Sequence, residues 1–287
     1  MRNYLLLFAA CIGVIFANNR FLFARTSISD NNAYPEFCRK AAKNPKIFNN
    51  FKQDPIYSEI LEHATYNQGK VYLNIVRKQT PEFLYLLNLF RQNDRIGNPK
   101  LFAYEDAGLF SPTTLRYMKV ASDLKKLFGS LDDLRIIEIG GGYGGQCTII
   151  HQIFKPKSYT IVDLPGPLAL TAKYLQKQQI HTVVLQQPNQ VKPNETYDLI
   201  ISNYAFSECN RAVQEEYITK ILGKSKKGYL TNNWTNESPK LNSYTKSQLI
   251  AKLQSMRKNC RVLPEVPLTH ANNYILIWED KPMMIKK

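Results

Sequence analysis

Residues 135–154 constrain the fold more than any other part of this 287-residue chain. They begin with an apolar run of strand length, continue with five glycines among residues 140–145, and end with apolar residues at helical spacing. A strand, a tight glycine turn and a helix in this order let the backbone approach a nucleotide closely and direct a helix N-terminus at it. A turn that binds nothing seldom needs five glycines. The segment therefore predicts a site for a nucleotide-type cofactor.

An acidic residue in the next apolar run indicates which cofactors are compatible with this turn. Residues 159–164 have the pattern of a second strand, and Asp163 lies eighteen residues past Gly145. A carboxylate at this point can accept hydrogen bonds from two ribose hydroxyls, and both dinucleotides and S-adenosylmethionine contain that ribose. Gly140, Gly142 and Gly145 satisfy the dinucleotide pattern G-x-G-x-x-G, so these glycines alone leave both cofactors open.

Glu138 favours S-adenosylmethionine. The order acidic, apolar, Gly-x-Gly-x-Gly from Glu138 to Gly144 resembles the first motif of class I methyltransferases. An uncharged glycine loop can lie against a methionine tail, whereas a dehydrogenase helix must meet a pyrophosphate. A short-chain dehydrogenase would also need Tyr-x-x-x-Lys after the loop, and the match at residues 66–70 precedes it. Both observations disfavour a dehydrogenase, and an NAD(P)-dependent oxidoreductase is kept as the alternative enzyme.

Strand and helix patterns alternate from the glycine turn to the end of the chain. Further strands are predicted at residues 182–186, 197–203 and 228–232, with a terminal hairpin from residues 262–263 and 274–278. Residues 212–222 have one apolar helical face, and a capping box at residues 245–248 begins another helix. We predict an α/β fold with a Rossmann-like class I methyltransferase sheet. It is mostly parallel with a terminal antiparallel hairpin, and an α-helical N-terminal region precedes it.

Three strings of residues resemble the sugar O-methyltransferase family. They are Glu-Ile-Gly-Gly-Gly-Tyr-Gly-Gly-Gln at 138–146, Asp-Leu-Pro at 163–165 and Ser-Asn-Tyr-Ala-Phe-Ser-Glu at 202–208, and the similarity extends over residues 94–235. The resemblance implies an S-adenosylmethionine-dependent O-methyltransferase acting on a sugar or glycan precursor, with residues 131–287 as the catalytic domain. Together with the general class I pattern, the resemblance implies a set of cofactor-binding residues: Glu138, Gly140, Gly141, Gly142, Tyr143, Gly144, Asp163, Leu164, Gln186 and Asn203. The class I pattern usually has an acidic or amide residue for adenine after the third strand, and here Gln186 or Gln187 must fill that role.

Methyl transfer to a hydroxyl is an in-line displacement, so a base or a metal must accept the proton of the weakly acidic hydroxyl. Glu208, at the predicted rim of the site, is the first candidate for the base, and His270, before the last strand, is the second. Glu208 can also be explained as a carboxylate near a helix N-terminus. Tyr204 would orient the acceptor or belong to the core. His63 and Asp106 are further candidates, and the sequence has no metal-binding signature.

Residues 26–130 show helical patterns without a strand order. Ser111-Pro112 begins a helix that ends at Phe128-Gly129, and residues 81–90 form a second apolar helical pattern. We predict that this region covers the acceptor site, where excluding water strengthens electrostatic interactions at the sulfonium. The alternative is a structural cap without a role in the reaction.

Residues 4–17 carry no charge and follow Arg2. This length is short for a membrane span and typical of a signal-peptide core, so residues 1–25 are predicted to be a signal or membrane-anchor segment. A buried N-terminal helix is the alternative. Because S-adenosylmethionine is made in the cytosol, we expect a cytoplasmic catalytic domain, with or without a membrane tether at the N-terminal segment. The alternative is a secreted or lumenal protein after signal cleavage. A non-catalytic membrane-tethered platform that keeps the fold is the third functional reading.

The net charge of +15 comes from Lys and Arg scattered along the whole chain. Nucleic-acid-binding proteins usually concentrate such charge with interleaved aromatic residues, and the sequence has no such stripe. We therefore expect an ordinary solvated surface first, attraction to an anionic membrane or an acidic glycan second, and nucleic acid last. A saccharide acceptor is the expected partner of the site.

Overall fold

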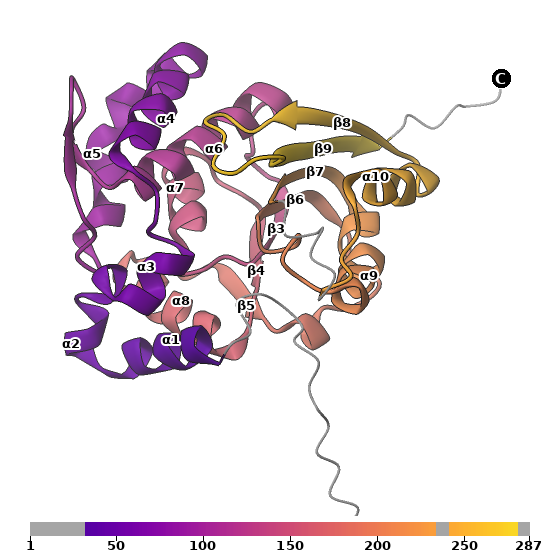
Figure 1. Cartoon of the computed structure of the whole chain (residues 1–287), viewed down its shortest axis with the longest axis horizontal. Coiled ribbons are helices and arrows are strands. Elements are labelled where there is room, and N and C mark those ends of the chain that lie inside the picture. Colours follow the sequence, from indigo (N-terminus) through magenta and orange to yellow (C-terminus); the bar gives the residue numbers. More distant parts are fainter. Residues whose placement is uncertain (1–31, 234–240, 281–287) are drawn as a thin grey trace, which may run out of the picture.

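The computed structural model describes residues 32–233 and 241–280, and within them a seven-stranded sheet has the order β5-β4-β3-β6-β7-β9-β8. The strands are β3 (Arg135–Ile139), β4 (Ser158–Val162), β5 (Val183–Gln186), β6 (Tyr197–Asn203), β7 (Ser225–Asn232), β8 (Lys258–Pro264) and β9 (Tyr274–Asp280). The first five are parallel to one another, whereas β9 runs antiparallel to β7 and β8 (Figure 1). This order confirms the predicted Rossmann-like sheet with a terminal antiparallel hairpin.

Alternate residues of the central strands enter two different hydrophobic cores, as expected for a sheet covered on both faces. Ile136 of β3 and Leu199 of β6 face the layer of α6 (Pro112–Phe128), α7 (Gly145–Ile153) and α8 (Pro165–Lys177). Ile137 and Ile200 face the opposite layer, which contains α9 (Arg211–Lys220) and α10 (Lys246–Ser255). α10 begins with the predicted capping box, in which Thr245 and Gln248 exchange hydrogen bonds.

The N-terminal helices form a further layer outside α6, α7 and α8 (Figure 1). They are α1 (Ala33–Lys43), α2 (Pro45–Phe48), α3 (Pro55–Ile60), α4 (Tyr66–Gln79) and α5 (Leu87–Phe90), with short 3-10 helices at Phe51–Gln53, Pro81–Leu86 and Arg91–Arg95. Contact between α1 and α8 is close, because a Cβ at Gly166 would lie 2.1 Å from the carbonyl oxygen of Pro35. The N-terminal layer therefore shares a continuous core with the sheet.

Two local features of the N-terminal region differ from the sequence prediction. The predicted helix at residues 81–90 is a 3-10 helix followed by α5, because Leu86 leaves the helical region with φ −101° and ψ 6°. This break lets Phe83 and Phe90 pack with ring centroids 6.1 Å apart, whereas residues seven apart on a straight helix are about 10 Å apart. A small hairpin, β1 (Phe102–Tyr104) with β2 (Gly108–Phe110), also lies in this region, and Asp106 and Gly108 supply positive φ angles for its turn.

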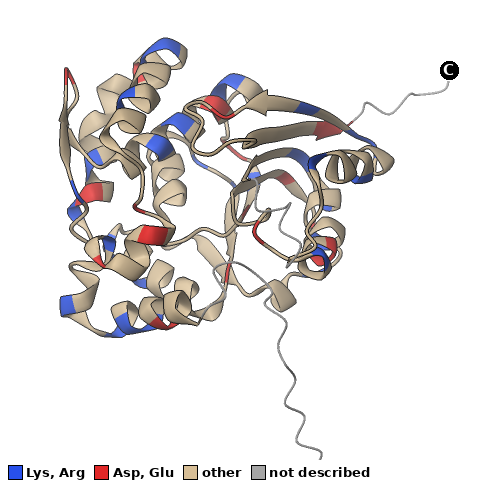
Figure 2. Ribbon diagram, in the orientation of Figure 1, with Lys and Arg blue, Asp and Glu red and all other residues tan. Residues whose placement is uncertain are grey.

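Lys and Arg are distributed over the N-terminal helices and the β8–β9 hairpin, with acidic residues between them (Figure 2). No helix in the described ranges is long and apolar enough to span a membrane. The predicted signal or anchor segment, residues 1–25, lies outside the described residues.

Candidate functional site

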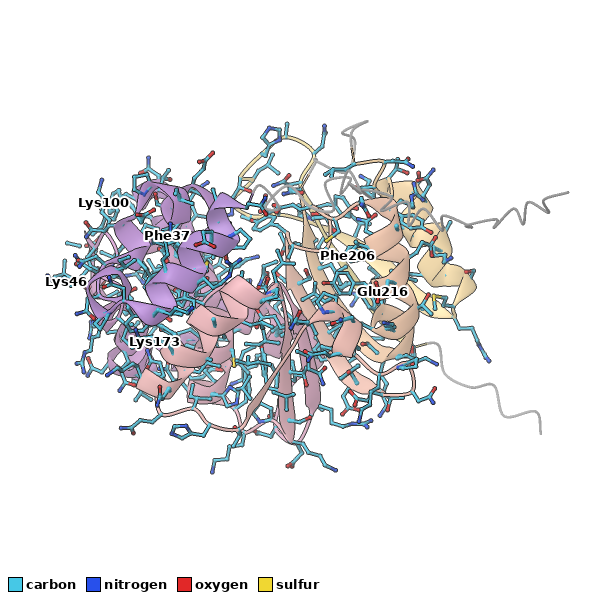
Figure 3. All side chains as sticks on the ribbon, turned by 90° about the horizontal axis from the view of Figure 1, so that it is seen from below. Phe37, Lys46, Lys100, Lys173, Phe206 and Glu216 are labelled. Atoms are coloured by element: carbon cyan, nitrogen blue, oxygen red, sulfur yellow. The ribbon has the colours of Figure 1, made fainter. Side chains whose placement is uncertain are left out.

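A cavity of about 810 Å³ lies at the carboxyl ends of β3, β4 and β6. Its other walls come from α3, α4 and α6, from the N-terminal part of α9, and from the loop between β8 and β9. Figure 3 shows Glu216, which lines the cavity from α9, across the sheet from Phe37 of α1. The cavity is therefore built from three parts of the chain that are far apart in the sequence: the N-terminal helices, the segments that follow the parallel strands, and the β8–β9 loop.

The glycine turn after β3 forms the floor of this cavity and has no room for side chains. A Cβ at Gly140 would lie 2.0 Å from the Cβ of Ala205, and one at Gly141 would lie 2.5 Å from Ile161. Gly140 also has a φ of +75°, which L-residues rarely adopt. Bare backbone is thus exposed to the cavity, as the sequence predicts for contact with a ligand.

Asp163 follows β4 at the edge of the same floor. Its Oδ2 accepts a hydrogen bond from the Gly142 N–H at 3.2 Å, and its Oδ1 accepts one from the Leu164 N–H at 2.7 Å. Burial raises the pKa of Asp163 to about 6, although these two backbone hydrogen bonds act in the opposite direction. Above that pH the group is an oriented carboxylate that faces the cavity and can accept further hydrogen bonds.

Glu138 lies at the end of β3 beneath the turn, with 2 % of its surface exposed. Its Oε2 accepts a hydrogen bond from the Tyr159 hydroxyl at 2.8 Å. Burial raises the pKa of Glu138 to about 8. A cation bound nearby would favour the ionised form and lower this pKa, so the site is suited to positive charge.

Three of the predicted cofactor residues do not line the cavity: Tyr143, Gly144 and Gln186. The Tyr143 ring is fully buried against Tyr174 at a centroid distance of 4.8 Å, and the Lys52 ammonium lies 4.2 Å from its centroid. Gly144 is the N-cap of α7, with φ +92°. Gln186 ends β5 and directs its backbone oxygen to the Asp163 N–H, and Pro188 lines the cavity at this point. Tyr143 therefore anchors the turn to the N-terminal layer.

The three predicted residues at the acceptor end, Glu208, Tyr204 and His270, line the same cavity. Glu208 accepts a hydrogen bond from the Asn233 side-chain amide at 2.7 Å. Nδ1 of His270 lies 3.0 Å from the carbonyl oxygen of Ala271, to which it donates a hydrogen bond, and Nε2 is the other ring nitrogen. α9 begins at Arg211, after Glu208, and its N-cap is Asn210.

Glu265, in the β8–β9 loop, fixes the geometry around Tyr204. Its carboxylate accepts hydrogen bonds from the Tyr204 hydroxyl, from the Thr269 N–H at 2.9 Å and from the Asn273 side chain at 3.1 Å. Tyr204 itself has a φ of +70° directly after β6. This network ties the loop that carries His270 to the end of the central strand. The sequence contained no signal for it, because the partners come from different segments.

The N-terminal region contributes polar groups to the cavity wall, including His63, Thr65 and Gln68. Arg116, on α6, also lines the wall and donates a hydrogen bond from Nη2 to the Leu61 carbonyl oxygen at 3.2 Å. The surrounding protein and the Arg116 charge lower the pKa of His63, so the imidazole is neutral at neutral pH. Asp106 is exposed in the β1–β2 turn and does not line the cavity. Among the residues that the structure describes, no group of three His, Cys, Asp or Glu side chains is arranged to hold a metal ion.

No protein-family model matches the sequence, and no curated protein matches it. The fold is similar to the methyltransferase domain of bacterial CtHen1-C, at 12% identity over 58% of this chain and 97% of that chain, with a TM-score of 0.43. It is similar to an O-methyltransferase family 2 protein from Planctomyces limnophilus, at 14% identity over 58% of each chain, with a TM-score of 0.42. A third similarity, to an rRNA methylase from Streptococcus thermophilus, has 16% identity over 53% of this chain and 90% of that chain, with a TM-score of 0.39. With identities and TM-scores this low, the strand order and the cavity remain the basis for the fold and the site.

Proposed function

We propose that this protein is an S-adenosylmethionine-dependent methyltransferase that transfers a methyl group to a hydroxyl of a sugar or glycan precursor. The observation that carries the proposal is the placement of Asp163. Two backbone N–H groups orient its carboxylate beside a glycine turn, and a buried acid, Glu138, lies beneath that turn. This combination suits a ribose with two hydroxyls linked to a positively charged sulfonium.

The residues present fit such a donor in size and charge. The cavity of about 810 Å³ lies in the range of about 300–1,000 Å³ that is typical of small-molecule sites. Asp163 would accept the ribose hydroxyls, Gly140 to Gly142 would contact the amino-acid part, and Val162, Leu164 and Pro188 would contact the adenine. When bound, the donor would supply an electrophilic methyl group on its sulfonium.

The chain's own residues would position the acceptor and receive its proton. Tyr204, held by Glu265, would orient the acceptor hydroxyl, since its ring lines the cavity beside the end of β6. Glu208 or Nε2 of His270 would take the hydroxyl proton as the new bond forms. The N-terminal helices would exclude water from this reaction, because α3, α4 and α6 form the outer wall.

Two observations favour a sugar-like acceptor. The cavity lining includes the polar side chains of Thr65, Gln68, Thr269 and Asn273, a type of side chain that exchanges hydrogen bonds with hydroxyl groups. The sequence also resembles sugar O-methyltransferases at the turn, at Asp163 and at residues 202–208. A membrane tether at residues 1–25 remains part of the proposal for where the enzyme acts.

Isothermal titration of the full chain with S-adenosylhomocysteine, with NAD as the comparison, tests the cofactor. Micromolar binding of S-adenosylhomocysteine without NAD binding is the expected result and would justify a screen of sugars with methyl-labelled donor. Binding of NAD alone would instead identify an oxidoreductase. A folded protein that binds neither ligand would favour the non-catalytic platform.

A further inference from the structure

Arg116 is a buried cation on the wall of the cavity. It comes from the first half of α6 and has 7 % of its surface exposed. Of the cavity-lining residues within the described ranges, it is the only Lys or Arg. An arginine cannot lose its charge at physiological pH, so burial here requires compensating partners.

The protein satisfies Arg116 only in part. Nη2 donates to the Leu61 carbonyl, and the guanidinium lies 5.7 Å and 5.9 Å from the ring centroids of Tyr117 and Tyr204. The buried Nε–H finds no acceptor in the parts of the chain that the structure describes. No described carboxylate lies within 4.0 Å of the guanidinium. A buried donor without an acceptor is costly, and a ligand or a water molecule in the cavity can supply the acceptor that the described residues do not.

Glu62 is a carboxyl group near enough to favour the charged form of Arg116, but it does not form an ion pair with it. Burial raises the pKa of Glu62, which weakens it as a counterion. One oxygen of Glu62, Oε1, also finds no hydrogen-bond partner among the described residues. Among the residues that the structure describes, Arg116 therefore has no ion-pair partner.

We infer that Arg116 binds a carboxylate of a ligand inside this cavity. The inference rests on the proposed function and makes it more specific, because it identifies the charged group of the ligand that the site recognises. Planar guanidinium groups bind carboxylates through two parallel hydrogen bonds, and Nε with one Nη forms the required pair of donors.

Two ligands of the proposed reaction could carry this carboxylate. Leu61, which accepts from Arg116, lies next to the glycine turn, since a Cβ at Gly142 would be 2.8 Å from its side chain. From this side Arg116 would meet the amino-acid carboxylate of the donor. The guanidinium also lies 5.9 Å from the ring centroid of Tyr204, and next to this residue Arg116 would meet an acid group of the acceptor, such as that of a uronic acid.

The first arm of the test compares two donor analogues on the full chain. S-adenosylhomocysteine has the carboxylate, whereas 5′-methylthioadenosine keeps the adenosine and the thioether but lacks the whole amino-acid group. Both are titrated into the wild type, Arg116→Gln and Arg116→Lys. The control is Lys125→Gln, which removes a positive charge from the same helix where Lys125 pairs with the exposed Glu82. A donor carboxylate predicts that Arg116→Gln weakens S-adenosylhomocysteine binding by about 10- to 100-fold and leaves methylthioadenosine binding unchanged.

The second arm uses D-glucuronate and D-glucose as probes, titrated into protein saturated with S-adenosylhomocysteine at constant ionic strength. An acceptor carboxylate predicts that the wild type prefers glucuronate and that Arg116→Gln abolishes this preference. In that case S-adenosylhomocysteine affinity is the same in the wild type and in Arg116→Gln. Arg116→Lys keeps the charge but loses the paired donors, so it should show a smaller loss in the same direction.

Two outcomes would overturn the inference. Equal losses for S-adenosylhomocysteine and methylthioadenosine would show that Arg116 only maintains the cavity. No difference between Arg116→Gln and Lys125→Gln in either arm would show that Arg116 binds no carboxylate. If Arg116→Gln does not fold, Arg116→Lys decides by the same criteria. If the wild type binds neither adenosine ligand, the proposed function is wrong, and the glucuronate titration, made without S-adenosylhomocysteine, decides the inference alone.

Discussion

Replacing Asp163 with Asn should separate cofactor binding from folding. In the wild type, one carboxylate oxygen accepts from the Leu164 N–H at 2.7 Å and the other from the Gly142 N–H at 3.2 Å. The amide keeps one acceptor oxygen and places its NH₂ group against one of these two donors. The lost hydrogen bond and the unsatisfied N–H should lower the free energy of unfolding by about 1–3 kcal/mol.

A second effect of this substitution has the opposite sign. Burial raises the pKa of Asp163 from 3.8 to about 6, so the folded state holds a proton that the unfolded chain has already lost. The stability contributed by this group is therefore present at low pH and is lost as the pH rises from about 4 to about 6. The shift corresponds to at most about 3 kcal/mol, since the carboxylate is partly open to the cavity. Asn lacks this loss, so near pH 8 the two effects should cancel to within about 2 kcal/mol.

Ligand binding has no such compensation. The carboxylate would accept hydrogen bonds from two ribose hydroxyls, each worth about 1.5–3 kcal/mol for a charged acceptor. Asp163→Asn should therefore weaken S-adenosylhomocysteine binding by about 100-fold or more in isothermal titration near pH 8. Urea unfolding at the same pH should show a folded variant of nearly unchanged stability.

The matched control is Asp132→Asn, at an exposed aspartate that also accepts a backbone hydrogen bond, from the Lys155 N–H at 2.7 Å. It should bind S-adenosylhomocysteine like the wild type. If folded Asp163→Asn also binds with wild-type affinity, Asp163 does not hold the ribose, and the orientation proposed for the donor is wrong.

Three further predictions concern the turn, the buried acid and the base. Gly140→Ala should lower the free energy of unfolding by about 2–4 kcal/mol in urea, because its Cβ would meet Ala205 at 2.0 Å and its φ is +75°. Gly129→Ala, with φ +81° and ψ −148° but no atom within 4 Å of the added Cβ, should lose only the backbone cost of about 1–3 kcal/mol, and a loss at Gly140 no larger than this one would contradict the close packing at Gly140. Burial raises the pKa of Glu138 from 4.5 to about 8, so the stability from this group is lost as the pH rises through that interval. The free energy of unfolding of Glu138→Gln should therefore increase relative to that of the wild type as the pH rises, by up to about 5 kcal/mol above pH 8. A difference in urea unfolding that does not change with pH would refute this. Glu208→Gln should lower kcat by about 10²- to 10⁴-fold with an accepted sugar while S-adenosylhomocysteine affinity stays the same. A normal kcat in Glu208→Gln with a low one in His270→Gln would assign the proton transfer to His270.

The sequence predicted the sheet well because its signals there are local. Apolar runs, glycine turns and capping boxes involve neighbouring residues, and β6 has the predicted bounds, Tyr197–Asn203. β7 begins three residues earlier than predicted, at Ser225, because its first residues include Lys226 and Lys227, which do not fit an apolar pattern. Lys226 instead pairs with Asp198 on the neighbouring strand at 2.8 Å. Only the paired strands reveal that these lysines belong to the sheet.

The site was predictable where parallel topology alone determines it. Residues that follow β3, β4 and β6 meet at one edge of the sheet, so the turn, Asp163 and Asn203 could be grouped from the sequence. Tyr143 lies in the same motif but turns away from the cavity, because Phe51 and Tyr174 form an aromatic pocket for it from segments far away in the chain. Arg116 was missed for the same reason. Its position in the wall depends on the loop at Leu61, which no local pattern indicates.

The distribution of charge inside the cavity also differs from that of the whole molecule. The chain has a net charge of +15, whereas the described cavity lining has four carboxyl groups, those of Glu138, Asp163, Glu208 and Glu216, and Arg116 as its one Lys or Arg. Because the field inside a low-dielectric cleft depends on the nearest groups, a cationic donor would meet an acidic environment within a basic protein. Burial raises the pKa of both Glu138 and Asp163, so the negative charge of these two groups develops only as the pH rises or as a cation enters. Arg116, as the one Lys or Arg in this lining, would then distinguish the carboxylate from the cationic part of a zwitterionic ligand, which net charge alone could not do.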